Sequence, residues 1–228
     1  MKRYLDRILV YGFIYYLIFN YSLIYVNHHS SLEELFSVIS YANEIDFVSH
    51  LFILIGNVLL ICSILINTMD EICEEKELEF YLLHRYQRRK SFTYGIIKRL
   101  LFKWIELIVI LFLSISLNLV IVLSSFNIMS INIKCILMLT LYCMKLSLIF
   151  ISLYLISKVL LIYCKENIMI IITFMITVII LTIDKLNPNI ALFKFSDNPL
   201  TILQPLLLFV TSLSLFAYFS NLKKEVKL

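Results

Sequence analysis

The sequence has few of the residues that make turns and few charges for its size. Three glycines and three prolines occur among 228 residues, and 16% of the residues are charged, whereas 61% are hydrophobic. Soluble domains are about 45–50% apolar and about 25% charged, so this composition excludes an ordinary soluble domain. With so few turn-forming residues, almost the whole chain is expected to be helix joined by short connectors.

The cysteines and histidines do not predict a chemical site. The five cysteines form no C-x-x-C pair, and four of them lie in or beside apolar runs, where a thiol behaves as a small hydrophobic side chain. Their spacing predicts no disulfide framework. The neighbouring His28 and His29 point apart on a helix, so we expect no metal site there.

Six apolar runs are each long enough to cross a bilayer as a helix, which takes about 20 residues. A membrane β-barrel would show short alternating segments, which these runs do not. The first run is longer than that of a secretory signal and no cleavage motif follows it, so we interpret it as a retained span. The predicted fold is therefore an all-α, polytopic membrane protein with one transmembrane domain over residues 1–228. Its predicted spans are 8–26, 47–67, 104–125, 135–157, 167–183 and 200–220.

Lysine and arginine are distributed unevenly between the two sides of these spans. Sixteen of the 20 basic residues fall in the two termini and in the segments after spans two and four, against three in the opposite loops. This bias predicts that both termini are cytosolic. A net charge of +4 and the lack of a large soluble surface argue against nucleic acid as a partner.

A large polar segment, 68–103, interrupts the apolar sequence between spans two and three. Acidic residues come first in it and basic residues follow, and the orientation rule predicts that it is cytosolic. Residues 70–84 are rich in helix formers, with acids in the first turns and an imperfect amphipathic pattern. We therefore predict a helix along the inner membrane surface that offers its charged side to a partner.

The residues of this segment resemble the stretch after the second span of ABC-2 type permeases, the membrane subunits of ATP-binding-cassette exporters. That family has an acid, then Gly-Thr-Leu-Glu, then Leu-Leu, a proline and an arginine. Lys76 and Glu77 depart from the Gly-Thr pair, and no proline follows. The positions in register are Glu75, Leu78, Glu79 and Leu82, with Arg85 or Arg88 as the base. Six spans, inward termini and a long loop after span two also agree with the family.

The resemblance implies a permease subunit that exports an amphipathic or hydrophobic substrate, with a bacteriocin-, lantibiotic- or toxin-like peptide as the expected cargo. It implies two copies of an ABC ATPase that carry ATP and magnesium, and a second permease chain, identical or homologous, in a bacterial plasma membrane. This chain is not expected to be an enzyme, because it lacks G-x-x-x-x-G-K-[ST]. The connector 158–166 would be a second, smaller ATPase contact. The coupling residues implied are Asp70, Glu71, Glu74, Glu75, Glu79, Leu82, Leu83, Arg85 and Arg88.

Two charged residues lie within the predicted spans. Lys145 is near the middle of span four, and Glu106 is one turn inside span three. A charge inside the bilayer costs at least about 2.5–3.5 kcal/mol, so each should face the bundle interior or water. In a structural role, Lys145 would sit at the outer interface or form an ion pair, with Glu106 as a candidate partner. In a functional role, Lys145 and Glu106 would both line a substrate path. Uncharged polar residues within spans are expected to join helices. These are Asn57, Asn118 and Thr140.

The loop 184–199 contains two Asn-Pro pairs, which predict a chain that leaves the helical region and folds back. An ordinary loop and a re-entrant element both fit this pattern, and Pro205 is a candidate kink near the start of span six.

Two other classes of function compete with transport. An intramembrane protease of the bacteriocin-immunity type would need an E-E-x-x-x-R motif, and neither Glu33-Glu34 nor Glu74-Glu75 has the arginine. An ATP-independent membrane immunity or scaffold protein fits the composition as well as a permease does. It would differ in what the segment 68–103 binds.

Overall fold

The computed structural model describes residues 2–25, 55–73, 89–126, 133–186, 192–193 and 199–225, and nearly all of them are helical. No β-strand occurs within those ranges, in agreement with the all-α prediction. The helices are α1 (Lys2–Tyr25), the helix Ile55–Cys73, α4 (Arg89–Phe126), α5 (Ile133–Tyr163), α6 (Glu166–Leu186), the short 3-10 helix η1 (Pro199–Ile202) and α7 (Leu203–Glu225).

Five stretches of these helices are long and apolar enough to cross a membrane. They are Ile55–Cys73, Lys98–Ile121, Leu139–Leu161, Glu166–Asp184 and Leu200–Tyr218. They overlap predicted spans two to six, and α1 covers most of the first predicted span. The chain is thus a helical protein of multi-pass character. The total of six spans and the cytosolic position of both termini stay predictions.

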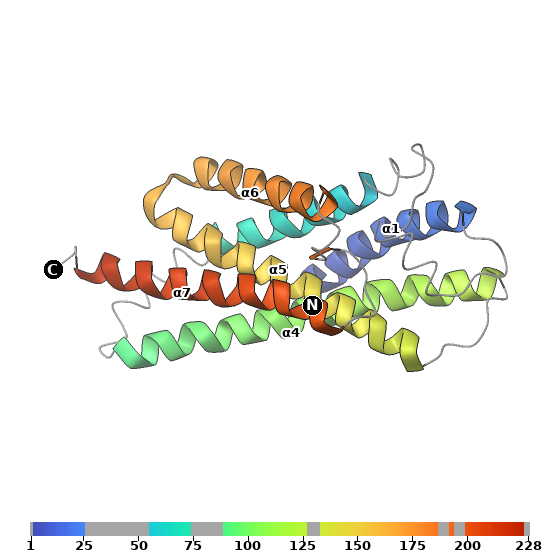
Figure 1. Cartoon of the computed structure of the whole chain (residues 1–228), viewed down its shortest axis with the longest axis horizontal. Helices are drawn as coiled ribbons and strands as arrows, with labels where there is room; N and C mark the ends of the chain where they lie inside the picture. Colours follow the sequence, from blue (N-terminus) through green and yellow to red (C-terminus); the bar gives the residue numbers. More distant parts are fainter. Residues whose placement is uncertain are drawn as a thin grey trace.

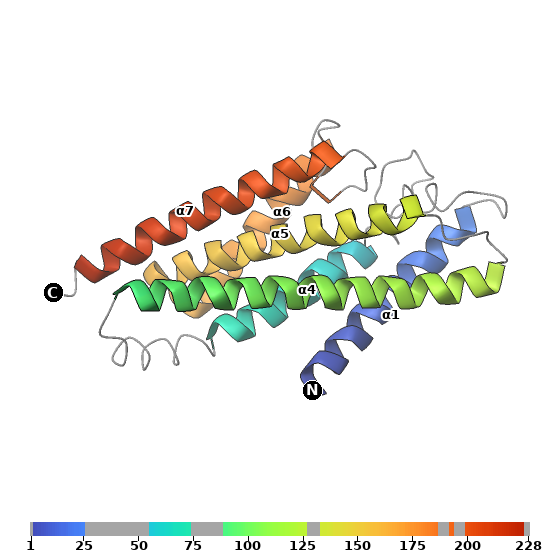
Figure 2. The same ribbon diagram turned by 90° about the horizontal axis from the view of Figure 1, so that it is seen from below.

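Helix α5 is the centre of the bundle. It packs against α4, α6 and α7, and α1 packs against α4. Figure 2 shows α7, α5 and α4 as successive rows, with α1 crossing α4. Of the apolar stretch in α5, 78% is buried, against 11% in α7. A helix that is apolar on all sides belongs in such a central position.

The outer helices expose large apolar side chains. Phe13 of α1, Phe102 of α4, Ile171 of α6 and Leu207 of α7 are each more than 60% exposed. A patch of this kind would be costly in water, whereas the tails of a lipid bilayer cover it without cost. The exposed faces therefore fit the span predictions, and Figure 1 shows the elongated bundle that results.

Two helix boundaries differ from the predicted span boundaries. The Ile55–Cys73 helix continues six residues beyond the predicted end of span two, because Met69 and Ile72 extend the buried stripe of Leu65 at helical spacing. Helix α4 begins at Arg89, so the last part of the segment 68–103 is continuous with span three. Residues 68–73 and 89–103 thus belong to long helices, and residues 74–84 of the predicted coupling helix lie outside the described residues.

Helices α5 and α6 meet in a tight turn. The amide of Cys164 donates to the carbonyl of Leu160 at 2.8 Å. Helix α6 starts at Glu166, and a negative charge in the first turn of a helix interacts favourably with the helix dipole. This turn, the end of the Ile55–Cys73 helix and the start of α4 lie at the same end of the bundle (Figure 2). Pro205 lies in the first turn of α7, where a missing N–H costs no helical hydrogen bond.

Candidate functional site: an ionic cluster between four helices

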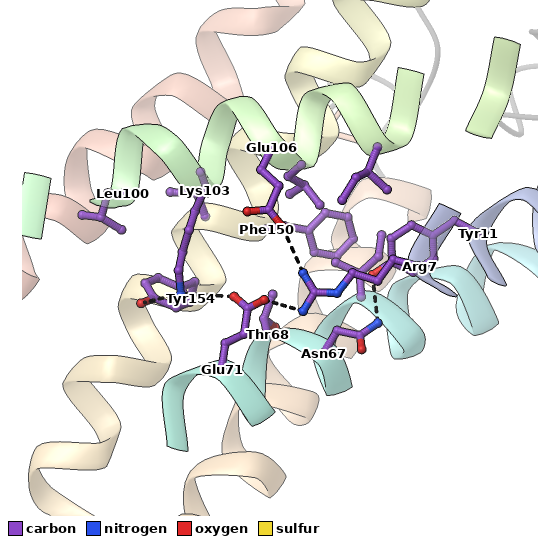
Figure 3. Close-up of a pocket in the computed structure, with 14 residues that line it drawn as sticks. Arg7, Tyr11, Asn67, Thr68, Glu71, Leu100, Lys103, Glu106, Phe150 and Tyr154 are labelled. Atoms are coloured by element: carbon purple, nitrogen blue, oxygen red, sulfur yellow. Dashed lines mark hydrogen bonds and ion pairs between the residues drawn. The ribbon is translucent and has the colours of Figure 1, made fainter. Parts of the chain in front are cut away.

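Arg7 of α1 connects two acidic residues from two other helices. Its guanidinium forms an ion pair with Glu71 through Nη2, and it donates to Glu106 Oε1 through Nη1 at 3.3 Å. Figure 3 shows the guanidinium between the two carboxylates. One arginine therefore joins α1, the Ile55–Cys73 helix and α4.

Lys103 extends the cluster to a fourth helix. Its Nζ lies 3.1 Å from Glu71 Oε2 and 3.4 Å from the hydroxyl of Tyr154 on α5. The same ammonium lies 4.7 Å from the centroid of the Tyr154 ring, and the Nζ of Lys158 lies 5.2 Å from it. The ring of Tyr154 thus lies near the ammonium groups of both lysines, and both distances are within the range of cation–π interactions. We use the name ionic cluster for Arg7, Glu71, Lys103 and Glu106.

Each helix contributes its polar residues as a pair at helical spacing. Side chains three or four positions apart lie on one face of a helix, so each pair faces the same neighbours. The pairs are Arg7 and Tyr11, Asn67 and Glu71, Lys103 and Glu106, and Tyr154 and Lys158. Asn67 also donates to the hydroxyl of Tyr11 at 3.0 Å, which adds a second polar contact between α1 and the Ile55–Cys73 helix.

The electrostatics of the ionic cluster are balanced. Two cationic and two anionic side chains lie together, and the side chains of Arg7, Glu71 and Glu106 are 12%, 20% and 30% exposed. Glu106 is eight residues inside the apolar stretch Lys98–Ile121, which is about 12 Å along the helix. An unpaired charge at such a place is expensive, so pairing is what makes the position tolerable.

Lys145 lies in a different polar group. It is 2% exposed and donates to Thr201 of η1 at 3.4 Å, and Asp184 of α6 is close enough to interact with it electrostatically. The pairing of Lys145 with Glu106 considered from the sequence is therefore wrong, because Glu106 pairs with Arg7. Lys145 lies nine residues before Tyr154 on α5, which separates the two groups by about 14 Å along the axis.

Asp184 also holds the chain that follows α6. Its carboxylate accepts the backbone N–H groups of Leu192 at 2.6 Å and Phe193 at 3.2 Å. The chain therefore folds back on the end of α6, as the Asn-Pro pairs predict. Lys145, Asp184 and Thr201 together join α5, α6 and η1 and are called the Lys145 group below.

The uncharged polar residues within the spans behave in two ways. Asn118 of α4 donates to the carbonyl of Gly12 on α1 at 2.8 Å, so it joins two helices as expected. Thr140 bonds to the carbonyl of Ile136 on its own helix instead. Two further contacts that the sequence did not reveal join neighbouring helices: Trp104 Nε1 donates to Ser147 at 2.9 Å, and Ser157 and Thr173 share a hydrogen bond of 3.0 Å.

The predicted coupling residues are described in part. Asp70 is exposed near the end of the Ile55–Cys73 helix, and Glu71 turns inward to the ionic cluster. The other seven predicted coupling residues lie outside the described residues: Glu74, Glu75, Glu79, Leu82, Leu83, Arg85 and Arg88.

Sequence reasoning missed the role of Arg7. It was counted as one of the bases that set the membrane orientation, yet its guanidinium joins three helices. A signal was present: Arg7 and Tyr11 are polar groups one turn apart on the face that also carries the buried Ile14 and Ile18.

The described residues offer no group of three or more His, Cys, Asp or Glu side chains that could hold a metal ion. In comparisons with known proteins, no family model, no curated protein and no solved structure matches the chain.

Proposed function

We propose that the chain is the membrane-spanning permease subunit of an ATP-binding-cassette exporter. It would couple ATP hydrolysis by a separate ATPase to the export of an amphipathic or hydrophobic substrate, with a bacteriocin-like peptide as the expected cargo. The partners are two ATPase copies and a second permease chain in a bacterial plasma membrane. The proposal rests on the resemblance of 75–88 to ABC-2 type permeases and on the multi-pass helical architecture.

The observation that supports it most is the position of Glu71. This residue lies in the last described turn of the Ile55–Cys73 helix, which leads into 74–88, and Lys103, its partner, lies in the helix that leads out of that segment. The helices on both sides of residues 74–88 are therefore connected to one ionic cluster. A force applied to the segment has a direct route to α1 through Arg7 and to α5 through Tyr154.

The mechanism follows from this connection. Closure of two ATPase subunits around ATP would push on residues 74–88, and the Ile55–Cys73 helix and α4 would shift together. Packed helices move as rigid bodies between a few discrete arrangements, so the ionic cluster would transfer the shift to α1 and α5. A path for the substrate would then open between two permease chains.

The experiment is capture of the ATPase in a mild detergent. The double charge reversal Glu75→Lys and Glu79→Lys should remove the ATPase from the purified complex, because both acids are predicted to contact it. The matched control reverses Glu33 and Glu34 in the loop predicted on the opposite side, and it should leave the ATPase bound. An undiminished ATPase in the first variant contradicts the proposed contact.

The alternative, an ATP-independent immunity or scaffold protein, predicts a different outcome. Immunity should then persist in cells in which the proposed partner ATPase is inactivated by substitution of its catalytic glutamate, and the purified protein should contain no ATPase. The permease proposal predicts loss of export in the same cells.

A further inference from the structure

A small pocket lies directly beside the ionic cluster (Figure 3). It has a volume of about 40 Å³ and is lined by residues of α1, the Ile55–Cys73 helix, α4 and α5. Its lining is mixed: the four residues of the ionic cluster, Asn67 and Thr68 supply polar atoms, and side chains such as Phe150 supply an apolar wall. About 10–15 Å³ is enough for one water molecule, so the pocket has room for more than one.

Arg7 carries a buried donor at this pocket. Its Nε is fully buried, and no residue of the described ranges accepts its hydrogen, although both Nη atoms are paired. Buried donors without an acceptor are rare in folded proteins, and where protein atoms do not supply the acceptor, ordered water usually does. The pocket lies beside the same side chain, so a small shift of the guanidinium brings Nε within reach of water held there.

We propose that the pocket is a water-binding site. Ordered water accepts the Nε hydrogen of Arg7 and donates to the carboxylates of Glu71 and Glu106. A buried water needs two to four polar partners, and the guanidinium, the two carboxylates and the Thr68 hydroxyl satisfy that requirement. Cavities that stay dry are lined by apolar groups throughout, which this pocket is not.

Internal water changes how the ionic cluster can behave. In a dry, low-dielectric setting an ion pair is held tightly, and separating its members leaves uncompensated charges. Water can hydrate a carboxylate while that carboxylate changes its cationic partner. The ion pairs of Arg7 and Lys103 with the two glutamates can therefore rearrange when the helices move. The polar contacts at this site therefore connect four helices and can still change when those helices shift. This inference holds whether or not the chain is a permease.

The test is X-ray radiolytic footprinting of the full-length protein in lipid nanodiscs. Radiolysis produces hydroxyl radicals at the positions of bound water, so side chains beside internal water are oxidised even when they are buried. Phe150 and Phe19 form a matched pair, because both are 1% exposed but only Phe150 lines the pocket. We expect oxidation of Phe150 to be several-fold faster than oxidation of Phe19. Equal, slow oxidation of the two rings overturns the proposal.

A pocket-filling variant provides the second measurement. Thr68→Leu places extra carbon atoms in the pocket and removes a hydroxyl that lines it. Oxidation of Phe150 should fall to the level of Phe19, with oxidation of Phe19 unchanged. Persistent labelling of Phe150 in this variant, when it remains folded, shows that the label does not come from the pocket and contradicts the proposal. If Thr68→Leu does not fold, Leu107→Phe fills the pocket from α4 and is judged by the same comparison.

The footprint requires neither ATP nor a partner protein. A dry pocket would therefore leave the permease proposal standing, and failure to capture an ATPase would leave the water site standing.

Discussion

Arg7 and Glu71 form an ion pair although 64 positions separate them in the sequence. Arg7 is near the start of the first helix, and Glu71 is near the end of the helix Ile55–Cys73. The pair fixes which faces of these two helices meet. Because Glu71 also pairs with Lys103 and Arg7 also pairs with Glu106, α4 is held in the same arrangement.

Replacement of Arg7 by methionine should destabilise the protein strongly. The substitution keeps an apolar stem of similar length but leaves Glu71 and Glu106 without their shared cation. Removing one partner from a buried ion pair costs about 3–5 kcal/mol, and we expect about 3 kcal/mol because the two carboxylates are partly exposed. The free energy of unfolding in bicelles, measured by steric trapping, is the appropriate readout.

Two further variants test the origin of that loss. Arg99→Met removes an exposed base from α4 and should change the free energy of unfolding little. Adding Glu71→Gln to Arg7→Met should restore part of the stability, because one uncompensated carboxylate is removed. If Arg99→Met costs as much as Arg7→Met, the ionic cluster is not the cause.

The spans could be predicted because their physical signal is strong. Runs of about 20 apolar residues have few other uses in a chain of this composition, and the described helices overlap the predicted spans. Helix ends were less well predicted, since polar residues such as Asp70 and Lys98 were read as extramembrane although nothing in their sequence stops a helix. Met69 and Ile72 could have indicated the continuation, because they keep the spacing of Leu65.

The ionic cluster could be predicted only in part. Each helix carries a polar pair at helical spacing, which indicates a polar face, but pairing between helices depends on their rotation and relative height. Glu106 was assigned a candidate partner in Lys145, and a difference in depth along the bundle separates them instead. Two of the glycines illustrate the same limit, since Gly12 and Gly56 look alike in sequence and differ in their surroundings.

Gly56 should not tolerate a side chain. A Cβ atom at this position would lie 2.5 Å from Cγ1 of Ile18 on α1, and Ile18 is 1% exposed and has little room to move. Overpacking of this kind costs about 1–3 kcal/mol. Gly56→Ala should therefore lower the free energy of unfolding despite the better helix propensity of alanine.

Gly12 provides the matched control for this prediction. A Cβ atom there has no neighbour within 4 Å, so Gly12→Ala should be neutral or slightly stabilising. Thermal unfolding of both variants in detergent, followed by loss of the monodisperse peak, gives the comparison. A stable Gly56→Ala protein would show that α1 and the Ile55–Cys73 helix are not in close contact at this point.

Lys145 and Asp184 should be coupled energetically. Lys145→Met removes the charge that compensates Asp184, and Asp184→Asn removes the charge that compensates Lys145, so each alone should be destabilising. The double variant should lose less stability than the sum of the two, with a coupling energy of about 0.5–3 kcal/mol. Steric trapping of the four proteins of the cycle measures it. Strict additivity would mean that the Lys145 group is not a structural pair.

Tyr154 should contribute mainly through its ring. Tyr154→Phe keeps the aromatic face over which Lys103 and Lys158 lie and loses the hydroxyl that accepts from Lys103 at 3.4 Å. Hydrogen bonds within membrane bundles average about 0.6 kcal/mol, so this variant should be mild. Tyr154→Leu removes the aromatic face as well, and loss of two cation–π contacts should cost about 1–2 kcal/mol more.

The measurement is the free energy of unfolding of both variants, with Tyr163→Leu as the control on the same helix. Tyr163 is 62% exposed, so its replacement should change stability little. Adding Lys158→Met to each Tyr154 variant separates the ring contact from packing, because the lysine substitution should matter beside phenylalanine and lose its effect beside leucine. Equal stability of Tyr154→Phe and Tyr154→Leu would contradict the ring contact, and the link from the ionic cluster to α5 would then depend on the hydroxyl alone.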